Sequence, residues 1–286
     1  MEPHPLPATA LVTGGGDGIG RAICVALAEH GCECITVVDL SLAAAQRTAA
    51  LCGSSGSVLP LSCDVTDESA LEEAFRAHRR RWGDRPMLCV ANAGVAESKA
   101  GWRTVVRVNL FGAIATAHLA LAHMRKPGGG GGAIVCLGSM GGVLPMADQP
   151  VYAATKAGVL HFVRSLAESL QLDGDSPDVV RVCALAPAIV ETQLAAEQRA
   201  ATSGERAAAA DAMLAERGGL LPPSRIAEAC LRLAVTRGGN GAVLRVFQDG
   251  TFRFHAQTGY PWSPTPPASL AQLPASARSL RRASRL

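Results

Sequence analysis

The chain of 286 residues is poor in several features, and each shortage excludes a class of protein. Its nine cysteines are scattered, odd in number and never spaced as CxxC, which argues against a zinc site or a disulfide framework. No uninterrupted apolar run approaches 18 residues, and the first residues lack the basic and apolar segments of a signal peptide. We therefore expect a reducing compartment, no bound metal and no membrane span.

Charge is also nearly balanced, with 27 lysines and arginines against 24 acidic residues. The segment 263–286 carries four arginines and no acid, so the rest of the chain is slightly acidic and no nucleic-acid partner is expected. This Pro-, Ser-, Ala- and Arg-rich tail is predicted to be disordered. It ends in Ser284-Arg285-Leu286, which resembles a peroxisomal address read by an import receptor, so the predicted localisation is cytoplasmic or peroxisomal.

Short apolar runs alternate with longer helical stretches along the chain. Seven runs are continuously apolar, as strands buried on both faces require: 10–12, 35–38, 58–61, 87–91, 133–137, 179–185 and 242–247. Helical stretches lie between them near 18–30, 41–52, 67–82, 102–125, 151–172 and 222–236. The pattern predicts an α/β fold: a single domain over 8–262 with a doubly wound parallel seven-stranded sheet. Residues 1–7 form an N-terminal extension, and the Ala-rich segment 191–217 is predicted to be a small helical substrate lid.

A glycine-rich turn, TGGGDGIG at 13–20, follows the first predicted strand and opens the first helix. Its glycines allow close approach to a pyrophosphate, and the helix start supplies free N–H groups. Asp39 ends the second strand, where an acid accepts hydrogen bonds from an adenosine ribose and repels a 2′-phosphate. Asp17 adds a second acid, so NAD is predicted rather than NADP. The competing interpretation is an ordinary helix cap with a turn aspartate.

The candidate catalytic residues belong to scarce types, since the chain has two tyrosines and only three lysines. Tyr152 stands four residues before Lys156 and thirteen after Ser139. Positions i and i+4 share one face of a helix, so we expect the ammonium group to lie beside the phenol and to lower its pKa below about 10. Such a tyrosine can act as a general base near neutral pH. The alternative is a surface tyrosine with an incidental neighbour.

With these residues in place, the chain resembles the short-chain dehydrogenase/reductase family from about residue 8 to 260. The matching pieces are TGGGDGIG at 13–20, Cys63-Asp64-Val65, Asn92-Ala93-Gly94, Asn109, Ser139, Tyr152-Ala-Ala-Thr-Lys156, Pro187 and Thr192. The resemblance implies a set of NAD contacts: Thr13, Gly14, Asp17, Gly18, Ile19, Gly20, Asp39, Asp64, Val65, Asn92, Ala93, Gly94, Tyr152, Lys156, Pro187, Val190 and Thr192. Among these, Asp64 and Val65 would hold the adenine and Thr192 the nicotinamide carboxamide.

The resemblance further implies oxidation of a secondary alcohol to a ketone by hydride transfer to NAD⁺, on a hydroxylated lipid. Tyr152 would take the hydroxyl proton and Lys156 would bind the nicotinamide ribose. Ser139 would hydrogen-bond the reacting oxygen. Asn109 would hold a water that relays protons to Lys156. Substrate contacts are expected from Ser139, Gln149, Tyr152 and Ile189.

Departures from the family pattern fall around the substrate. Ala188 stands where a glycine is expected, Ile189 where an aromatic is expected, and Arg217-Gly218-Gly219 replaces an aromatic end of the lid. A hydroxysteroid or a 3-hydroxyacyl compound therefore stays open as the substrate. A catalytically silent NAD(H)-binding sensor is the alternative from another class. The resemblance also implies a homodimer packed through the helices at 102–125 and 151–172.

Overall fold

The computed structural model describes residues 3–53, 57–125, 130–172, 180–200, 203–216, 218–255 and 269–273. The predicted address Ser284-Arg285-Leu286 and most of the predicted basic tail lie outside these ranges. Disorder of the tail and peroxisomal or cytoplasmic localisation therefore stay predictions.

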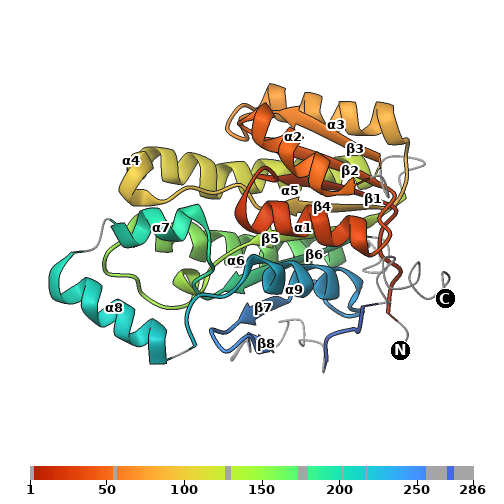
Figure 1. Ribbon diagram of the computed structural model, residues 1–286. Helices are drawn as coiled ribbons and strands as arrows, with labels where there is room; N and C mark the ends of the chain where they lie inside the picture. The colour runs from red at the N-terminus through yellow and green to blue at the C-terminus, as the bar shows by residue number, and fades with distance from the viewer. Residues whose placement is uncertain are drawn as a thin grey trace, which may run out of the picture.

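One sheet runs through the centre of the molecule, with the strand order β3-β2-β1-β4-β5-β6-β7-β8 within the described residues (Figure 1). Its strands are β1 Thr9–Thr13, β2 Cys34–Asp39, β3 Ser57–Ser62, β4 Met87–Ala91, β5 Gly132–Leu137, β6 Val180–Pro187, β7 Val243–Val246 and β8 Phe252–Phe254. Strands β1 to β7 pair in parallel, which confirms the predicted doubly wound sheet. The short β8 adds an antiparallel edge that the sequence did not reveal, because three residues are too few for an alternating strand pattern to be recognised.

Helices cover both faces of the sheet, as the continuous apolar strands require. One face carries α1 Gly18–Glu29 and α9 Pro223–Val235, and the other carries α3 Glu68–Trp82, α5 Ala113–Met124 and α6 Pro150–Leu172. Helix α2 Leu42–Leu51 lies beside β2 and β3. The segment predicted as a lid forms α7 Gln193–Ala200 and α8 Gly204–Glu216, which project from one end of the molecule (Figure 1).

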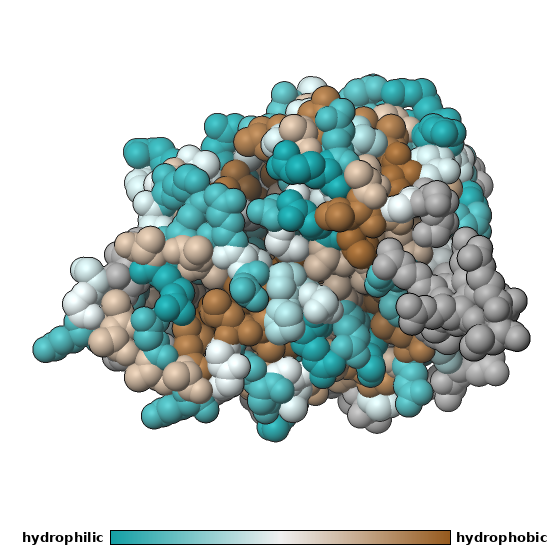
Figure 2. All heavy atoms as spheres, in the orientation of Figure 1, coloured by the Kyte–Doolittle hydropathy of each residue, from teal (hydrophilic) through white to brown (hydrophobic). Residues whose placement is uncertain are grey.

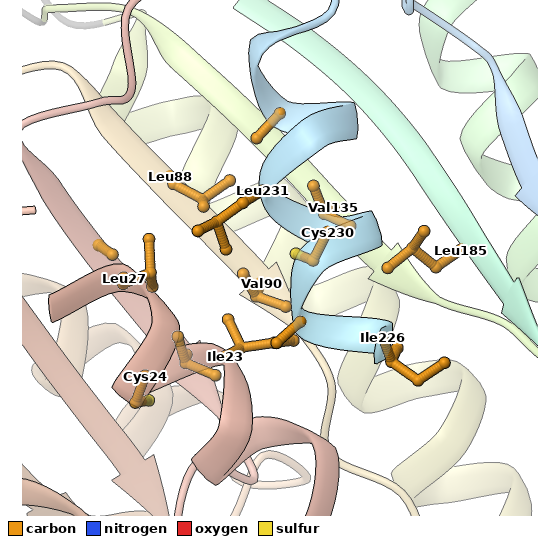
Figure 3. Packing of buried hydrophobic residues seen from close by; sticks show 14 of the residues in the cluster. Ile23, Cys24, Leu27, Leu88, Val90, Val135, Leu185, Ile226, Cys230 and Leu231 are labelled. Carbon is orange, nitrogen blue, oxygen red and sulfur yellow. The ribbon is translucent and has the colours of Figure 1, made fainter. Parts of the chain in front are cut away.

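The two crossover helices α1 and α9 pack against each other on the sheet (Figure 3). Ile23 and Leu27 of α1 meet Ile226 and Leu231 of α9 above the strand residue Leu88, and all five side chains are fully buried. Burying one such aliphatic side chain contributes about 1.5–3 kcal/mol. All nine cysteines are buried and free, and Cys24 and Cys230 lie within this same cluster.

The helix predicted over 102–125 begins earlier, at α4 Glu97–Val105, and continues through a π-helical turn, η2 Val106–Gly112, into α5. Gly101 (φ 71°, ψ 154°) kinks its first part, in a conformation that only glycine adopts without strain. The whole run Glu97–Met124 has 28 residues, and its most apolar 18-residue window has a mean hydropathy of 1.6, enough by length and composition to cross a membrane. It packs against β4, β5, α3 and α6, so it is a core helix of the fold.

A buried polar network joins β1, β2 and α3. His78 Nδ1 lies 2.8 Å from Thr36 Oγ1, and His78 Nε2 lies 3.2 Å from Thr9 Oγ1. Trp82 Nε1 donates to Thr36 Oγ1 at 3.2 Å, which completes the network. Burial, with a smaller effect from His123, lowers the pKa of His78 from 6.5 to about 4. The ring is therefore neutral at pH 7, and its two hydrogen bonds link α3 to β1 and β2 in the core.

This network predicts an acid-sensitive contribution to stability. The unfolded chain binds a proton at His78 below pH 6.5, whereas the folded protein does so only near pH 4. The free energy of unfolding should fall as the pH drops from 6.5 toward 4, by up to about 3 kcal/mol from this residue. Urea unfolding across this range should show a flatter pH dependence for His78→Gln than for the native protein. Identical slopes would contradict the assignment.

Candidate active site

A cavity of about 850 Å³ opens at the carboxyl ends of the strands, next to the place where the strand order reverses between β1 and β4. This is where open parallel sheets bind ligands. The glycine-rich turn lines one end of the cavity, and the helices α4, α7 and α8 contribute to the other. Hydrophobic atoms are visible between the lid helices and the body of the molecule (Figure 2).

The glycine-rich turn is held against the end of β4 by side-chain hydrogen bonds. Asn92 Nδ2 donates to the carbonyl oxygens of Thr13 (2.9 Å) and Gly14 (3.0 Å). In return, Thr13 Oγ1 accepts from the N–H groups of Asn92 (3.1 Å) and Ala93 (3.3 Å). A Cβ on Gly20 would lie 2.1 Å from the Gly14 carbonyl oxygen, so the start of α1 approaches the turn too closely for any side chain. The chain is thus built for a backbone surface that a pyrophosphate can approach.

The acids predicted to select the dinucleotide have different surroundings. Asp39 at the end of β2 accepts from the N–H groups of Gly16 and Ser41, both at 2.9 Å, and lines the cavity. Its fixed carboxylate suits the hydroxyl groups of a ribose and opposes a 2′-phosphate. Asp17 instead forms a salt bridge with Arg21 at 3.0 Å, a partner that the sequence analysis missed. Of the two acids, Asp39 is therefore the one expected to favour NAD over NADP.

Most predicted cofactor and substrate residues line the cavity: Gly14, Asp17, Gly18, Ile19, Asp39, Asn92, Ala93, Gly94, Ser139, Tyr152, Lys156, Pro187, Ile189, Val190 and Thr192. Six predicted residues do not: Thr13, Gly20, Asp64, Val65, Asn109 and Gln149. Thr13 binds the backbone after β4, and Gly20 packs against the Gly14 carbonyl, so both support the turn on the side away from the cavity. Val65 is buried close to Gly112 of the π-helical turn, and Asp64 is exposed and accepts from Thr66 N at 2.8 Å.

The catalytic candidates come together at the start of α6 and the end of β5. Ser139 Oγ accepts from Gly141 N at 3.0 Å, and a hydrogen bond from the Ser139 hydroxyl favours the ionised form of the Tyr152 phenol and so acts to lower its pKa. Lys156 Nζ donates to the Leu137 carbonyl at 2.8 Å and lies 5.8 Å from the centre of the Tyr152 ring. Burial lowers the pKa of Lys156 from 10.5 to about 8, so the ammonium form still predominates at pH 7.

The expected effect of Lys156 on the tyrosine needs correction. Burial raises the pKa of Tyr152, and the effect that opposes it comes from the hydrogen bond to Ser139. The reason is geometric, because Lys156 directs its ammonium group to the Leu137 carbonyl at the end of β5. The two residues do share one helix face, as predicted, but desolvation of the phenol outweighs the hydrogen bond with Ser139, and the pKa of Tyr152 rises.

The side chain of Asn109 is bound to the backbone of Val95. Its Oδ1 accepts from Val95 N at 2.8 Å, and its Nδ2 donates to Val95 O at 3.0 Å. Both ends of the amide therefore bind the backbone after β4, and the water relay from Asn109 to Lys156 stays a prediction. A Cβ on Gly94 would lie 3.4 Å from Asn109 Oδ1 and 3.6 Å from Lys156 Nζ, so the two side chains do meet at the same place. Asn109 shapes the site.

The two remaining predicted substrate residues, Gln149 and Ile189, are both hydrogen-bonded to the side chain of another residue. Gln149 is buried, and its Oε1 accepts from Gln198 Nε2 of the lid helix α7 at 3.0 Å. Ile189 is held through its backbone, because its N–H donates to Gln248 Oε1 at 3.2 Å and its carbonyl accepts from Gln248 Nε2 at 3.1 Å. Gln248 also donates to the Gly219 carbonyl and thus joins the two ends of the lid.

Sequence reasoning missed three residues of this site: Gln248, Glu97 and Lys99. Lys99 of α4 pairs with Glu197 of α7 at 2.7 Å. The scarcity of lysine, which drew attention to Lys156, applies equally to Lys99 and could have identified it. Glu97 accepts hydrogen bonds at the start of α6, and Gln248 acts only on backbone groups, so neither carries a local sequence motif.

The arrangement is that of a dinucleotide-dependent oxidoreductase, and the family model described as short chain dehydrogenase matches residues 8–203. The chain belongs to this family. It is 34% identical over 244 residues to mouse 15-hydroxyprostaglandin dehydrogenase [NAD(+)], across 83% of this chain and 88% of the relative.

Solved structures of the same family superpose well on this fold. Levodione reductase matches with a TM-score of 0.73 and 26% identity, across 84% of this chain and 96% of that structure. The 3-ketoacyl-(acyl-carrier-protein) reductase from Brucella melitensis, complexed with NADH, matches with a TM-score of 0.69, 26% identity and the same two coverages.

The close approach of α1 to the turn predicts that Gly20→Ala weakens dinucleotide binding. The added Cβ must displace the Gly14 carbonyl, a strain of about 1–3 kcal/mol that should lower NADH affinity roughly 10-fold. Titration of NADH fluorescence measures the effect. Gly53→Ala is the matched control, because nothing lies within 4 Å of its Cβ; its positive φ should cost about 1–2 kcal/mol of stability but leave NADH affinity unchanged. Native affinity in Gly20→Ala would contradict the packing argument.

Proposed function

We propose that this protein oxidises a secondary alcohol to a ketone with NAD⁺. The observation that supports it most is the Ser139–Tyr152–Lys156 constellation, which lies at one cavity with the turn at 13–20. NAD is the cofactor: Asp39 suits a free ribose, and the mouse relative is named for NAD(+). When bound, NAD⁺ accepts the hydride from the carbinol carbon.

The residues of the chain have distinct tasks in this reaction. The alcohol loses a hydride and a proton; Tyr152 Oη, as the phenolate, takes the proton, so the products are ketone, NADH and neutral tyrosine. Ser139 donates a hydrogen bond to the reacting oxygen or to the phenolate, which favours the ionised form of the tyrosine. Lys156 supplies a buried positive charge up to about pH 8 and holds the end of β5 in place.

The proposed substrate is a hydroxylated lipid. Apolar side chains from three regions line the cavity beyond the catalytic group, among them Leu144, Met146, Leu194 and Leu214. Such a wall suits a long apolar molecule with one hydroxyl group. The name of the mouse relative points to the same class. Initial rates with NAD⁺ should therefore be higher for 15-hydroxy eicosanoids than for hydroxysteroids or 3-hydroxyacyl compounds. The reverse order would contradict the proposed lipid substrate but not the proposed oxidation of a secondary alcohol.

The general-base assignment predicts the behaviour of Tyr152→Phe. Its kcat should fall at least roughly 100-fold, because the hydroxyl proton has no acceptor, while NADH affinity stays native. In the native enzyme, kcat/KM for oxidation should rise with pH as the phenol ionises, and the raised pKa of Tyr152 moves that rise upward. Ketone reduction needs the neutral phenol and should follow the opposite trend. Turnover above about a tenth of native in Tyr152→Phe would refute the assignment, and NADH binding without oxidation of any alcohol would indicate a silent sensor.

We also propose that the protein is a homodimer packed through the Glu97–Met124 run. Only 44% of the most apolar 18-residue window of this run is buried within one chain. The run also exposes two aromatic side chains, Trp102 (52% exposed) and Phe111 (38% exposed). An apolar helix face of this kind suits a second copy of the same chain.

Light scattering should give a mass of about twice 29.5 kDa for the native protein and a lower mass for Phe111→Glu. Leu51→Glu is the matched control, because Leu51 on α2 is even more exposed (53%) than Phe111, and the introduced glutamate should leave the mass unchanged. A native monomer, or a Phe111→Glu dimer, would remove the proposal.

A further inference from the structure

The helix that carries the catalytic tyrosine begins without a cap from its own segment. Ala153 N donates to Gln149 O at 3.0 Å, which makes Gln149 the N-cap residue of α6. The first N–H groups of a helix have no partner inside the helix. Pro150 has no N–H, so Val151 and Tyr152 are the two donors that need an acceptor.

A carboxylate from a distant part of the chain supplies that acceptor. Glu97 Oε2, in the first turn of α4, accepts from Val151 N and from Tyr152 N, each at 3.0 Å. Its negative charge also complements the positive end of the α6 dipole. One oxygen therefore fixes the backbone of the catalytic tyrosine at two consecutive residues.

The side chain of the N-cap residue, Gln149, does not cap its own helix. Helix caps are ordinarily Ser, Thr, Asp or Asn, whose short side chains reach back to the second or third N–H of their own helix. Here the Gln149 side chain accepts from Gln198 of the lid. With position 149 committed to the lid, the start of α6 depends on Glu97.

The same turn of α4 reaches the lid. Ser98 Oγ donates to the Glu197 carbonyl at 3.4 Å, and Lys99 Nζ pairs with the Glu197 carboxylate at 2.7 Å. Three consecutive residues thus connect the catalytic helix, through Glu97, with the substrate-facing helix α7, through Ser98 and Lys99. The hydrogen bonds from the first turn of α6 to the Glu97 carboxylate are direct.

We propose that Glu97 is a positioning residue for Tyr152, an inference that rests on the proposed dehydrogenase function. Its carboxylate holds the first turn of α6 so that the phenol stays against Ser139 at the end of β5. Misplacement of a reacting group by about 1 Å can cost on the order of 100-fold in rate. The effect should fall on kcat, since Glu97 does not line the cavity.

The test compares Glu97→Ala with Glu97→Gln, whose amide oxygen can still accept both N–H groups. Glu97→Ala should lower kcat on the order of 10-fold or more with native KM for NAD⁺ and native NADH affinity. Glu97→Gln should keep kcat within about threefold of native. Glu72→Ala is the matched control, because it removes an exposed carboxylate paired only with Arg76 and should leave kcat unchanged.

Amide hydrogen exchange at Val151 and Tyr152 gives a readout that does not require turnover. Exchange there should accelerate in Glu97→Ala and stay near native in Glu97→Gln. Native kcat in Glu97→Ala, or equal losses in the Ala and Gln variants, would overturn the proposal. If Glu97→Ala does not fold, Glu97→Asp, with a shorter reach, replaces it under the same criteria. A native protein that oxidises no alcohol would refute the proposed function, whereas native exchange in Glu97→Ala would refute the Glu97 contact itself.

Discussion

The site depends on the hydrogen bonds that join the ends of β1 and β4 through Asn92 and Thr13. Strand order reverses between these two strands, so their connections leave in opposite directions and open a crevice there. Asn92 closes the base of that crevice by binding the carbonyls of Thr13 and Gly14. The glycine-rich turn consequently keeps its shape through contacts behind it, and its cavity face stays available for a ligand.

Desolvation governs the electrostatics of the catalytic group. Burial raises the pKa of Tyr152 and lowers that of Lys156, so each residue is driven toward its neutral form. A hydrogen bond with Ser139 opposes the shift in the pKa of the phenol, and an electrostatic interaction with Cys136 opposes the shift in the pKa of the ammonium group. The chemistry therefore rests on Ser139 as much as on the lysine, although lysine spacing was the stronger signal in the sequence.

The parallel sheet and the candidate catalytic residues could be predicted from the sequence because both correspond to local sequence patterns. Continuous apolar runs marked the seven parallel strands, and the i, i+4 spacing placed Tyr152 and Lys156 on one helix face. The tertiary contacts left no such mark. The Asn109 amide binds Val95 and Gln248 binds the backbone of Ile189, and neither distant pairing can be read from spacing. The antiparallel strand β8 was not predicted because a segment of three residues is too short to show a periodic pattern.

The start of α6 carries a local sequence signal for a tertiary contact. Pro150 marks the first turn of a helix, yet Gln149 is a poor capping residue, so the donors at 151 and 152 had to find an acceptor elsewhere. A helix that starts at a proline behind a non-capping residue therefore indicates a tertiary cap, and α4 supplies it through Glu97. Because the lid occupies Gln149 and also pairs with Lys99, lid and catalytic helix meet at the first turn of α4. The contacts of α7 therefore converge on the turn of α4 whose Glu97 binds the backbone of the tyrosine.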